Sequence, residues 1–303
     1  MHELLAKECE IIVAPDTEAA TFKRLVRDVD GLIVRNQLPP DIFDEVERLR
    51  AVVRHGVGLD MIPVSAATQK RIAVANLPGC NSQAVAEYCI AGMLGLRRNL
   101  VGMNVSLRQN GWAKARPLAD QYTELGNSTL GIVGVGSIGK LVARMAIGLG
   151  MDVLGLTRTP KGLPSGIKAV DKETLFRQSD AVVLTCPLTE QTRNLVDRST
   201  IDSMKTHAIV INVSRGPVVD TDALILALRE GRLGGAVLDV FDSQPLSGRE
   251  AVFDCPNLIL TPHCAGLTQS SSYNTSKWAV QTILALMQNQ RLENVVNPEV
   301  FKV

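Results

Sequence analysis

The sequence predicts an α/β fold built on parallel sheets, and three observations lead to this prediction. Short apolar runs rich in β-branched residues recur along the chain, and helix-length amphipathic segments separate them. Such runs are what strands buried on both faces require. A glycine-rich turn joins one of the runs to a helical segment. Because parallel strands are joined by crossover connections, the alternation favours an α/β architecture.

Length and composition limit the classes of protein to which the chain can belong. Its 303 residues are enough for two domains of ordinary size. Lysine and arginine number 32 against 31 aspartate and glutamate, so the basic excess typical of nucleic-acid binding is missing. No stretch approaches the roughly 18 apolar residues of a membrane span, and Met1–Glu8 lacks the apolar core of a secretory signal. We therefore expect a soluble, cytoplasmic protein with neither a nucleic-acid nor a membrane partner.

Cysteine usage points to the same compartment. The six cysteines form no CxxC pair and no zinc-like cluster; they are Cys9, Cys80, Cys89, Cys186, Cys255 and Cys264. We expect free thiols in a reducing environment and no metal site.

The apolar runs fall into two series. The first series predicts strands at Glu10–Ala14, Gly31–Arg35, Ala51–Arg54 and Ala73–Asn76. The second predicts strands at Thr129–Val133, Val153–Thr157, Ala181–Cys186, Ala208–Val213, Ala236–Val240 and Leu258–Thr261. A long helical pattern from about Gln83 to Gln109 separates the two series, as a domain connector would. A second helix, roughly Ser271–Gln290, can carry the C-terminal tail back to the first domain.

A glycine motif stands at the first strand of the second series. Gly134, Gly136 and Gly139 follow the strand Thr129–Val133, and a helical segment continues from Lys140. In this context the first glycine permits a tight turn, the second lets the backbone approach a pyrophosphate, and the third allows close packing of helix and strand. The N–H groups and the positive end of the helix dipole would hold the phosphates. The motif predicts a Rossmann-type domain that binds a dinucleotide.

The end of the next strand bears on the choice of dinucleotide. An NAD site usually has an aspartate or glutamate there, which binds the ribose hydroxyls. This sequence has Thr157 and Arg158 instead. A guanidinium can pair with a 2′-phosphate. We therefore expect NADP or NAD as cofactor, with NADP somewhat favoured.

Three polar residues end consecutive strands of the second series. Arg215 comes just past one strand, Asp239 ends the next, and His263 follows the last. Open α/β sheets bind ligands at the carboxyl ends of their strands. Arg215 presents a planar fork of donors suited to a carboxylate. The three positions predict an active site at one edge of the sheet.

Motifs along nearly the whole chain extend this pattern. They are His55–Asp60, Asn76–Ser82 with Ala84–Glu87, the glycine motif, Pro187–Thr192, Ser214–Gly216, Leu238–Phe241 and Thr261–His263. With these motifs the sequence resembles the D-isomer-specific 2-hydroxyacid dehydrogenases, a family that includes glyoxylate/hydroxypyruvate reductases and phosphoglycerate dehydrogenases.

The resemblance implies an arrangement of domains. A doubly wound parallel-sheet nucleotide domain of Rossmann type, residues 99–274, would be inserted into a flavodoxin-like catalytic domain, residues 1–98 and 275–303. The active site would lie in the cleft, and the enzyme would be a homodimer through its nucleotide domain.

The resemblance also implies roles for single residues. His263 would be the acid/base, and Arg215 with the backbone N–H groups of Val57 and Gly58 would bind a small-molecule substrate, as would Asn81. A hydride would pass between the nicotinamide and the second carbon of the substrate. The residues expected to bind the cofactor are Gly134, Gly136, Ser137, Ile138, Thr157, Arg158, Cys186, Pro187, Thr192, Val213, Asp239 and His263.

Two features depart from the family pattern. Gln244 stands before Pro245, where the family has the glutamate that pairs with the catalytic histidine. The usual N-terminal strand is also missing, because the chain opens in what looks like the first helix. From this we expect either a start codon assigned too late or a catalytic domain that is loose near Glu10–Ala14.

Three functions are compatible with these residues. We favour a 2-ketoacid reductase of the glyoxylate/hydroxypyruvate type. A formate-dehydrogenase-like enzyme is the second, since that relative also carries glutamine before this proline. The third is a dinucleotide-sensing interaction protein with weak activity, although the presence of Arg215 and His263 favours an enzyme.

Overall fold

The computed structural model describes residues 8–301 of the chain, so most of the segment that bears on a secretory signal lies outside it. The chain divides into two compact units. The first contains the N-terminal segment through Asn81 and the C-terminal segment from Leu267, and the second contains Ser82–Gly266. Among the described residues, no two cysteines form a disulfide. No helix of residues 8–301 is long and apolar enough to cross a membrane.

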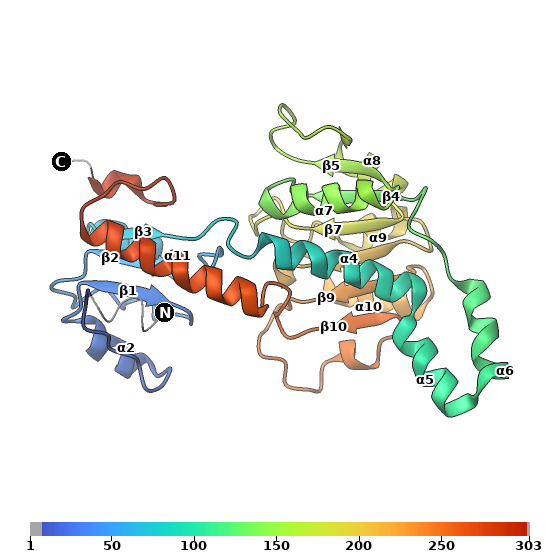
Figure 1. Ribbon diagram of the computed structural model, residues 1–303, viewed down its shortest axis with the longest axis horizontal. Helices are drawn as coiled ribbons and strands as arrows, with labels where there is room; N and C mark the ends of the chain where they lie inside the picture. The colour runs from blue at the N-terminus through green and yellow to red at the C-terminus, as the bar shows by residue number, and fades with distance from the viewer. Residues whose placement is uncertain (1–7, 302–303) are drawn as a thin grey trace. The chain divides into compact units, whose positions relative to one another are not determined.

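The first unit is built on a three-stranded parallel sheet of order β1-β2-β3 (Figure 1). Its strands are β1 (Gly31–Val34), β2 (Ala51–Arg54) and β3 (Ala73–Ala75), and its helices are α2 (Ala19–Val26), α3 (Val64–Gln69) and α11 (Gln269–Met287). Alternate strand residues face opposite sides. Val53 packs against Ala279 and Ile283 of α11, whereas Val52 packs on the other side with Val26 of α2. The sheet is therefore covered on both faces.

The C-terminal tail returns to this sheet, as expected. The N–H of Val296 donates to the carbonyl of Val74 at 2.8 Å. The buried Asn297 accepts from the Val74 N–H at 2.7 Å and donates to the Ile72 carbonyl at 2.9 Å. The short 3-10 helix η4 (Pro298–Phe301) follows.

The prediction of a strand at Glu10–Ala14 is wrong. This segment has no regular secondary structure, and the side chains of Ile12 and Val13 are 54% and 66% exposed. A short apolar run forms a strand only when burial and pairing support it. Ile11 packs partly against the core, but no described strand pairs with this segment. The described sheet of this unit has three strands.

The second unit contains a seven-stranded parallel sheet of order β10-β9-β8-β7-β4-β5-β6. The strands are β4 (Thr129–Val133), β5 (Asp152–Leu156), β6 (Ile167–Ala169), β7 (Ala181–Leu184), β8 (Ile209–Asn212), β9 (Gly235–Leu238) and β10 (Leu258–Leu260). The chain starts at the central strand and winds outward in both directions, which is the doubly wound order of dinucleotide-binding domains. Strand β6 was not expected from the sequence, because it is a short edge strand whose residues are half-buried or exposed.

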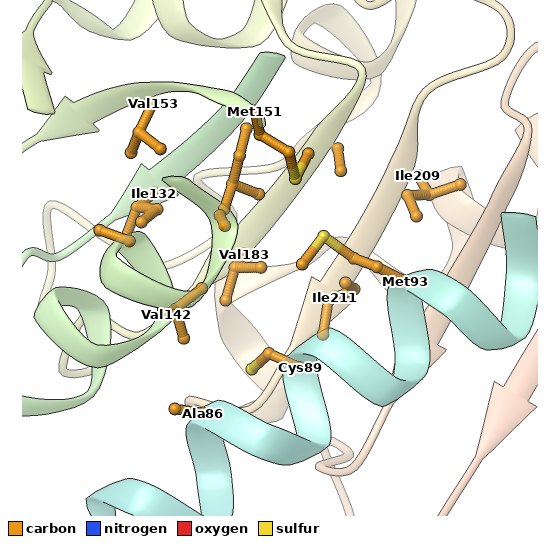
Figure 2. Close-up of a cluster of buried hydrophobic side chains, with 14 of the residues drawn as sticks. Ala86, Cys89, Met93, Ile132, Val142, Met151, Val153, Val183, Ile209 and Ile211 are labelled. Atoms are coloured by element: carbon orange, nitrogen blue, oxygen red, sulfur yellow. The ribbon is translucent and has the colours of Figure 1, made fainter. Parts of the chain in front are cut away.

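Helices cover both faces of this sheet. On one side, α4 (Ser82–Arg98) and α7 (Ser137–Gly148) contribute Cys89, Met93 and Val142 to a core that includes Ile132 and Ile211 of the strands (Figure 2). On the other side lie α8 (Lys172–Gln178), α9 (Arg198–Ser203) and α10 (Thr221–Arg229). The 3-10 helices η2 (Gly216–Val218) and η3 (Ala251–Asp254) belong to the connecting segments. The inner strands β7, β8 and β9 are thus buried on both faces, as their continuous apolar runs predict.

The single helix expected over 83–109 is two helices. Asn99, with a φ of 39°, separates α4 from α5 (Leu100–Asn110), and its side-chain oxygen accepts from the Gly102 N–H at 3.1 Å. Asparagine tolerates the left-handed conformation and caps helices well, which explains the break. The short α6 (Trp112–Ala115) and η1 (Arg116–Gln121) follow.

The division between the units comes after Asn81 and after Gly266, whereas the sequence placed it after residues 98 and 274. Helix α4 packs on β8 and β9 of the seven-stranded sheet, and its contacts therefore assign it to the second unit.

Asp180 connects three segments of the second unit just before β7. Its carboxylate accepts from the Thr129 N–H at 2.8 Å, from Lys205 Nζ at 2.9 Å and from His207 Nε2 at 2.7 Å. Burial raises the pKa of this carboxyl, but the hydrogen bonds from Lys205, Thr129 and His207 outweigh burial and lower the pKa of Asp180 to about 2.

Candidate functional site

The glycine turn between β4 and α7 has the shape that a dinucleotide needs. Gly134 has a φ of +92°, and a Cβ on it would lie 2.8 Å from the backbone of Cys186. A Cβ on Gly139 would lie 2.4 Å from the carbonyl oxygen of Gly134. A Cβ on Gly136, by contrast, would have no described atom within 4 Å. The outer glycines are thus required for packing, and the middle one leaves open space beside the start of the helix.

This turn fits the phosphates of a dinucleotide. Gly136 is the N-cap of α7 and brings no side chain to the first N–H groups of the helix. Ser137 is exposed and Ile138 is half-buried in the first turn. Backbone N–H groups and the helix dipole at such a start bind anionic phosphate.

The segment after β7 supports the same turn. Thr185 Oγ1 donates to the carbonyl of Gly134 at 2.6 Å, a contact that the sequence did not predict. Thr192 Oγ1 donates to the Pro187 carbonyl at 2.7 Å and accepts from the Thr189 N–H at 2.7 Å, which closes the loop 187–192. Burial raises the pKa of Cys186 to about 11, so its thiol stays protonated.

The end of β5 lies beside the glycine turn, because Gly134 N–H donates to the carbonyl of Leu156 at 2.9 Å. Thr157 Oγ1 accepts from the Thr159 N–H at 3.4 Å, and the Arg158 side chain is exposed. The strand end therefore presents a hydroxyl and a guanidinium where a ribose would be bound.

The turn that carries Arg215 follows β8 and is built by a buried amide. Asn212 is 1% exposed; its Oδ1 accepts from the N–H and Oγ of Ser214 at 3.0 and 2.9 Å, and its Nδ2 donates to the Arg215 carbonyl at 2.9 Å. Arg215 Nη1 in turn donates to the Ser214 carbonyl at 2.7 Å. Val213, just before this turn, is half-buried and donates its N–H to the carbonyl of Leu184 at 3.4 Å.

Gly216 joins this turn to the segment after β9. A Cβ at Gly216 would lie 2.1 Å from the carbonyl carbon of Phe241 and 2.3 Å from the N of Asp242. Only glycine permits this approach, so the Arg215 turn and the segment leading to Gln244 are packed backbone to backbone.

Asp239, at the end of β9, holds the loop that follows β10. Asp239 is buried, with 2% of the residue exposed. Oδ1 accepts from Thr261 Oγ1 at 2.6 Å and from the Cys264 N–H at 2.8 Å, and Oδ2 accepts from the Ala265 N–H at 2.9 Å. Asp239 therefore fixes residues on both sides of His263, a structural task in addition to the cofactor contact that the resemblance implies.

His263 has an exposed side chain on a strained backbone, with a φ of 53°. Its Nδ1 lies 2.9 Å from Gln244 Oε1. An amide oxygen can only accept, so Nδ1 donates, and in the neutral ring Nε2 is the proton acceptor. The partner of His263 Nδ1 is thus Gln244, and the nearby Asp242 carboxylate accepts from Thr221 Oγ1 at 3.1 Å.

Tyr88 of α4 completes this cluster. Its hydroxyl lies 2.6 Å from Thr261 Oγ1, 173 residues away in sequence. Burial, reinforced by the Asp239 carboxylate and opposed by the bond to Thr261, raises the pKa of Tyr88 to about 12. The phenol therefore stays protonated.

The residues expected to bind substrate from the first third lie in the first unit. Arg54 ends β2 and binds the loop that follows: its Nε donates to the Gly58 carbonyl at 3.1 Å and its Nη1 donates to the His55 carbonyl at 2.8 Å. Asn76 Nδ2 donates to the Val57 carbonyl at 2.8 Å. Three carbonyls of the loop are thus fixed by side chains.

Asn81 and His55 add two observations to this loop region. Asn81 Oδ1 is buried and has no hydrogen-bond partner among the described residues, as expected of an acceptor that serves a ligand. Burial and the nearby Arg35 lower the pKa of His55 to about 4, so its imidazole is neutral at pH 7, and Nε2 lies 3.0 Å from Ser276 Oγ.

The structure therefore brings most of the expected residues together in the second unit. Arg215, Asp239 and His263 follow the adjacent parallel strands β8, β9 and β10, as predicted, and the glycine turn follows β4 in the same sheet. Val57, Gly58 and Asn81 lie in the first unit. Sequence reasoning missed Thr185 and Tyr88, because their partners Gly134 and Thr261 are far away in the sequence. It also missed Asn212, whose contacts with Ser214 and Arg215 are local but match no motif.

Known proteins resemble this chain over nearly its whole length. Residues 90–265 match the family model described as "D-isomer specific 2-hydroxyacid dehydrogenase, NAD binding domain". A glyoxylate reductase of Thermococcus litoralis is 35% identical, with 91% of this chain and 86% of that protein covered.

Solved structures of dehydrogenases also resemble this chain over most of its length. An NADPH-dependent glyoxylate/hydroxypyruvate reductase from Sinorhizobium meliloti, in complex with NADP and malonate, superposes with a TM-score of 0.83 at 31% identity, covering 94% of this chain and 89% of that one. An NAD-dependent formate dehydrogenase from Staphylococcus aureus, in complex with NAD, gives a TM-score of 0.84 at 26% identity, covering 97% and 89%. The glycine turn, the three strand ends and these similarities show that the chain belongs to the D-isomer-specific 2-hydroxyacid dehydrogenases, a family of NAD(P)-dependent oxidoreductases.

Proposed function

We propose that the protein reduces a small 2-keto acid of the glyoxylate or hydroxypyruvate type to the corresponding 2-hydroxy acid, the D isomer where the product is chiral, with His263 as the acid/base and Arg215 as the substrate-binding residue. The observation that carries the proposal is the hydrogen bond of 2.9 Å from His263 Nδ1 to Gln244 Oε1, which orients the imidazole and makes Nε2 the nitrogen that would exchange a proton with substrate. Similarity to reductases named for these substrates supports the substrate class.

The proposed mechanism divides the work among the residues of the site. When bound, the reduced nicotinamide supplies a hydride to the carbonyl carbon of the substrate. Protonated His263 gives its Nε2 proton to the carbonyl oxygen, so the carbonyl group of the substrate becomes a hydroxyl group. Arg215 binds the carboxylate through its guanidinium. That Val57, Gly58 and Asn81 also bind substrate remains a prediction from the family resemblance.

For the cofactor we propose NADPH, used at least as well as NADH. Arg158 is exposed at the end of β5, and the segment Thr157–Pro160 carries no carboxylate to repel a 2′-phosphate. Gly134, Gly136, Ser137 and Ile138 would hold the pyrophosphate.

A substrate panel tests the proposed function. Wild-type protein is assayed with NADPH and glyoxylate, hydroxypyruvate or pyruvate, and separately with NAD⁺ and formate. We expect reduction of glyoxylate or hydroxypyruvate and no oxidation of formate. His263→Asn should abolish reduction while the fold persists, because asparagine tolerates the positive φ at this position.

The two other functions give different results in the same panel. Oxidation of formate would identify a formate-dehydrogenase-like enzyme, which Gln244 and the similarity to such an enzyme make the second candidate. Formate has no hydroxyl proton to lose, so its oxidation releases only a hydride. Tight dinucleotide binding without turnover of any substrate would identify a dinucleotide-sensing interaction protein.

We also propose that the protein is a homodimer through the second unit. Large apolar side chains are exposed on α5 and at the start of α6, at 42% to 77%: Leu100, Val101, Val105, Leu107 and Trp112. Such a patch is typical of an interface. Sedimentation should show a dimer for the wild type and a monomer for Val101→Glu combined with Trp112→Glu, whereas exposed-site changes elsewhere should leave the dimer intact.

A further inference from the structure

The loop that carries His263 is tied to helix α4 by a hydrogen-bond chain. Asp239 accepts the Thr261 hydroxyl proton at 2.6 Å. A threonine hydroxyl has only one proton. Since that proton goes to Asp239, the contact of 2.6 Å between Thr261 and Tyr88 must use the Tyr88 proton. The chain therefore runs from Tyr88 O–H to Thr261 O–H to the Asp239 carboxylate, and each bond polarises the next.

His263 needs such support because its backbone is strained. A non-glycine residue with a φ of 53° is held there only when its surroundings fix it. Asp239 binds Thr261 before His263 and Cys264 and Ala265 after it. Tyr88 restricts the side chain of Thr261, through which Asp239 binds the N-terminal side of the loop.

We propose that Tyr88 is a positioning residue for His263, acting through Thr261 and Asp239. The proposal rests on the proposed function of His263. Tyr88 comes from α4, which is packed on the sheet through Cys89 and Met93, so the chain connects the loop to a rigid part of the core. Without the Tyr88 hydroxyl, Thr261 loses one partner and the loop samples other conformations, in which the His263 ring leaves its productive orientation.

The first test compares variants that differ by one hydroxyl group. Tyr88→Phe and Thr261→Val should each lower kcat for glyoxylate reduction by about threefold to tenfold, the effect of one lost hydrogen bond. Thr261→Ser keeps the hydroxyl and should retain most of the activity. Thr200→Val is the matched control. It removes a hydroxyl of α9 that donates to the Leu195 carbonyl at 3.1 Å, and it should leave kcat unchanged.

A second measurement does not depend on activity. The chain has four histidines, His2, His55, His207 and His263. In a protein labelled with ¹⁵N-histidine, the imidazole signals can be assigned by single substitution to asparagine. We expect Tyr88→Phe to shift or broaden the His263 signals and to leave those of His207, which pairs with Asp180, unchanged.

Each outcome has one meaning. An unchanged His263 signal in Tyr88→Phe, or a kcat loss in Thr200→Val equal to that in Thr261→Val, overturns the positioning role. Full activity of His263→Asn overturns the proposed function instead, and the imidazole spectrum still decides whether Tyr88 fixes the ring.

Discussion

Replacing Gln244 by glutamate would put a carboxylate on the hydrogen bond that orients His263. The two side chains have nearly the same shape, and the distance from His263 Nδ1 to the side-chain oxygen is 2.9 Å in the wild type. Glutamine orients the ring without charge, whereas a carboxylate would also favour the protonated imidazole. Reduction needs the protonated ring as proton donor. The rate of reduction should therefore fall at a higher pH in the variant than in the wild type.

The size of the shift follows from the exposure of the ring. Unit charges about 4 Å apart attract by about 1 kcal/mol in water and about 4 kcal/mol at an effective dielectric constant of 20. Because the His263 side chain is exposed, the lower end applies. An energy of about 1.4 kcal/mol corresponds to one pH unit. We expect the falling limb of the profile to move upward by about one pH unit.

The assay is kcat/KM for glyoxylate reduction with NADPH across the pH range in which an imidazole titrates. Ser243→Glu is the matched control, since it adds a carboxylate one residue away on an exposed side chain without touching the hydrogen bond. The falling limb of the pH profile of Ser243→Glu should move much less than that of Gln244→Glu. If Asp242→Asn moves the limb and Gln244→Glu does not, the assignment of Gln244 as the partner of His263 is refuted.

Three further predictions concern the second unit. Arg158→Ala should raise KM for NADPH by about tenfold to a hundredfold and leave KM for NADH nearly unchanged; a wild type that prefers NADH by tenfold or more would contradict the proposed cofactor choice. Gly136→Ala should keep the thermal stability of the apoprotein and lose its stabilisation by NADPH, whereas Gly139→Ala should lower the melting temperature itself, because its Cβ would meet a carbonyl at 2.4 Å. The depressed pKa of Asp180 stabilises the fold above pH ~4, and this contribution, about 1–2 kcal/mol after allowance for solvent, is lost as the pH falls toward 2. Acid titration of Asp180→Asn, followed by circular dichroism, should show a smaller loss of stability over that range, and an unchanged loss would refute the assignment.

Much of this fold could be predicted from short stretches of the sequence. The turn at Gly134–Gly139 was predictable because each glycine has a steric reason within one strand–turn–helix unit. The strand ends at Arg215, Asp239 and His263 were predictable because parallel strands place their carboxyl ends at the same edge of a sheet.

Other features depend on contacts that no short window contains. Tyr88 meets Thr261 across 173 residues, and nothing in its own surroundings distinguishes it from a core aromatic residue. Ile12 and Val13 look like part of a strand, yet they stay exposed because no partner strand among the described residues pairs with them. Asn99 ends a helix whose apolar pattern continues past it, since a single left-handed residue changes direction without changing the pattern.

The left-handed backbone at His263 lowers the stability of the fold while the side chain at this position is needed for activity. The left-handed backbone conformation costs a residue with a Cβ, such as histidine, on the order of 1–3 kcal/mol, whereas glycine adopts it at almost no cost. His263→Gly should therefore yield an inactive protein that withstands heat as well as the wild type or better. Random mutation followed by selection for heat resistance alone would tend to discard the histidine, so directed evolution of this enzyme needs selection for turnover in every round.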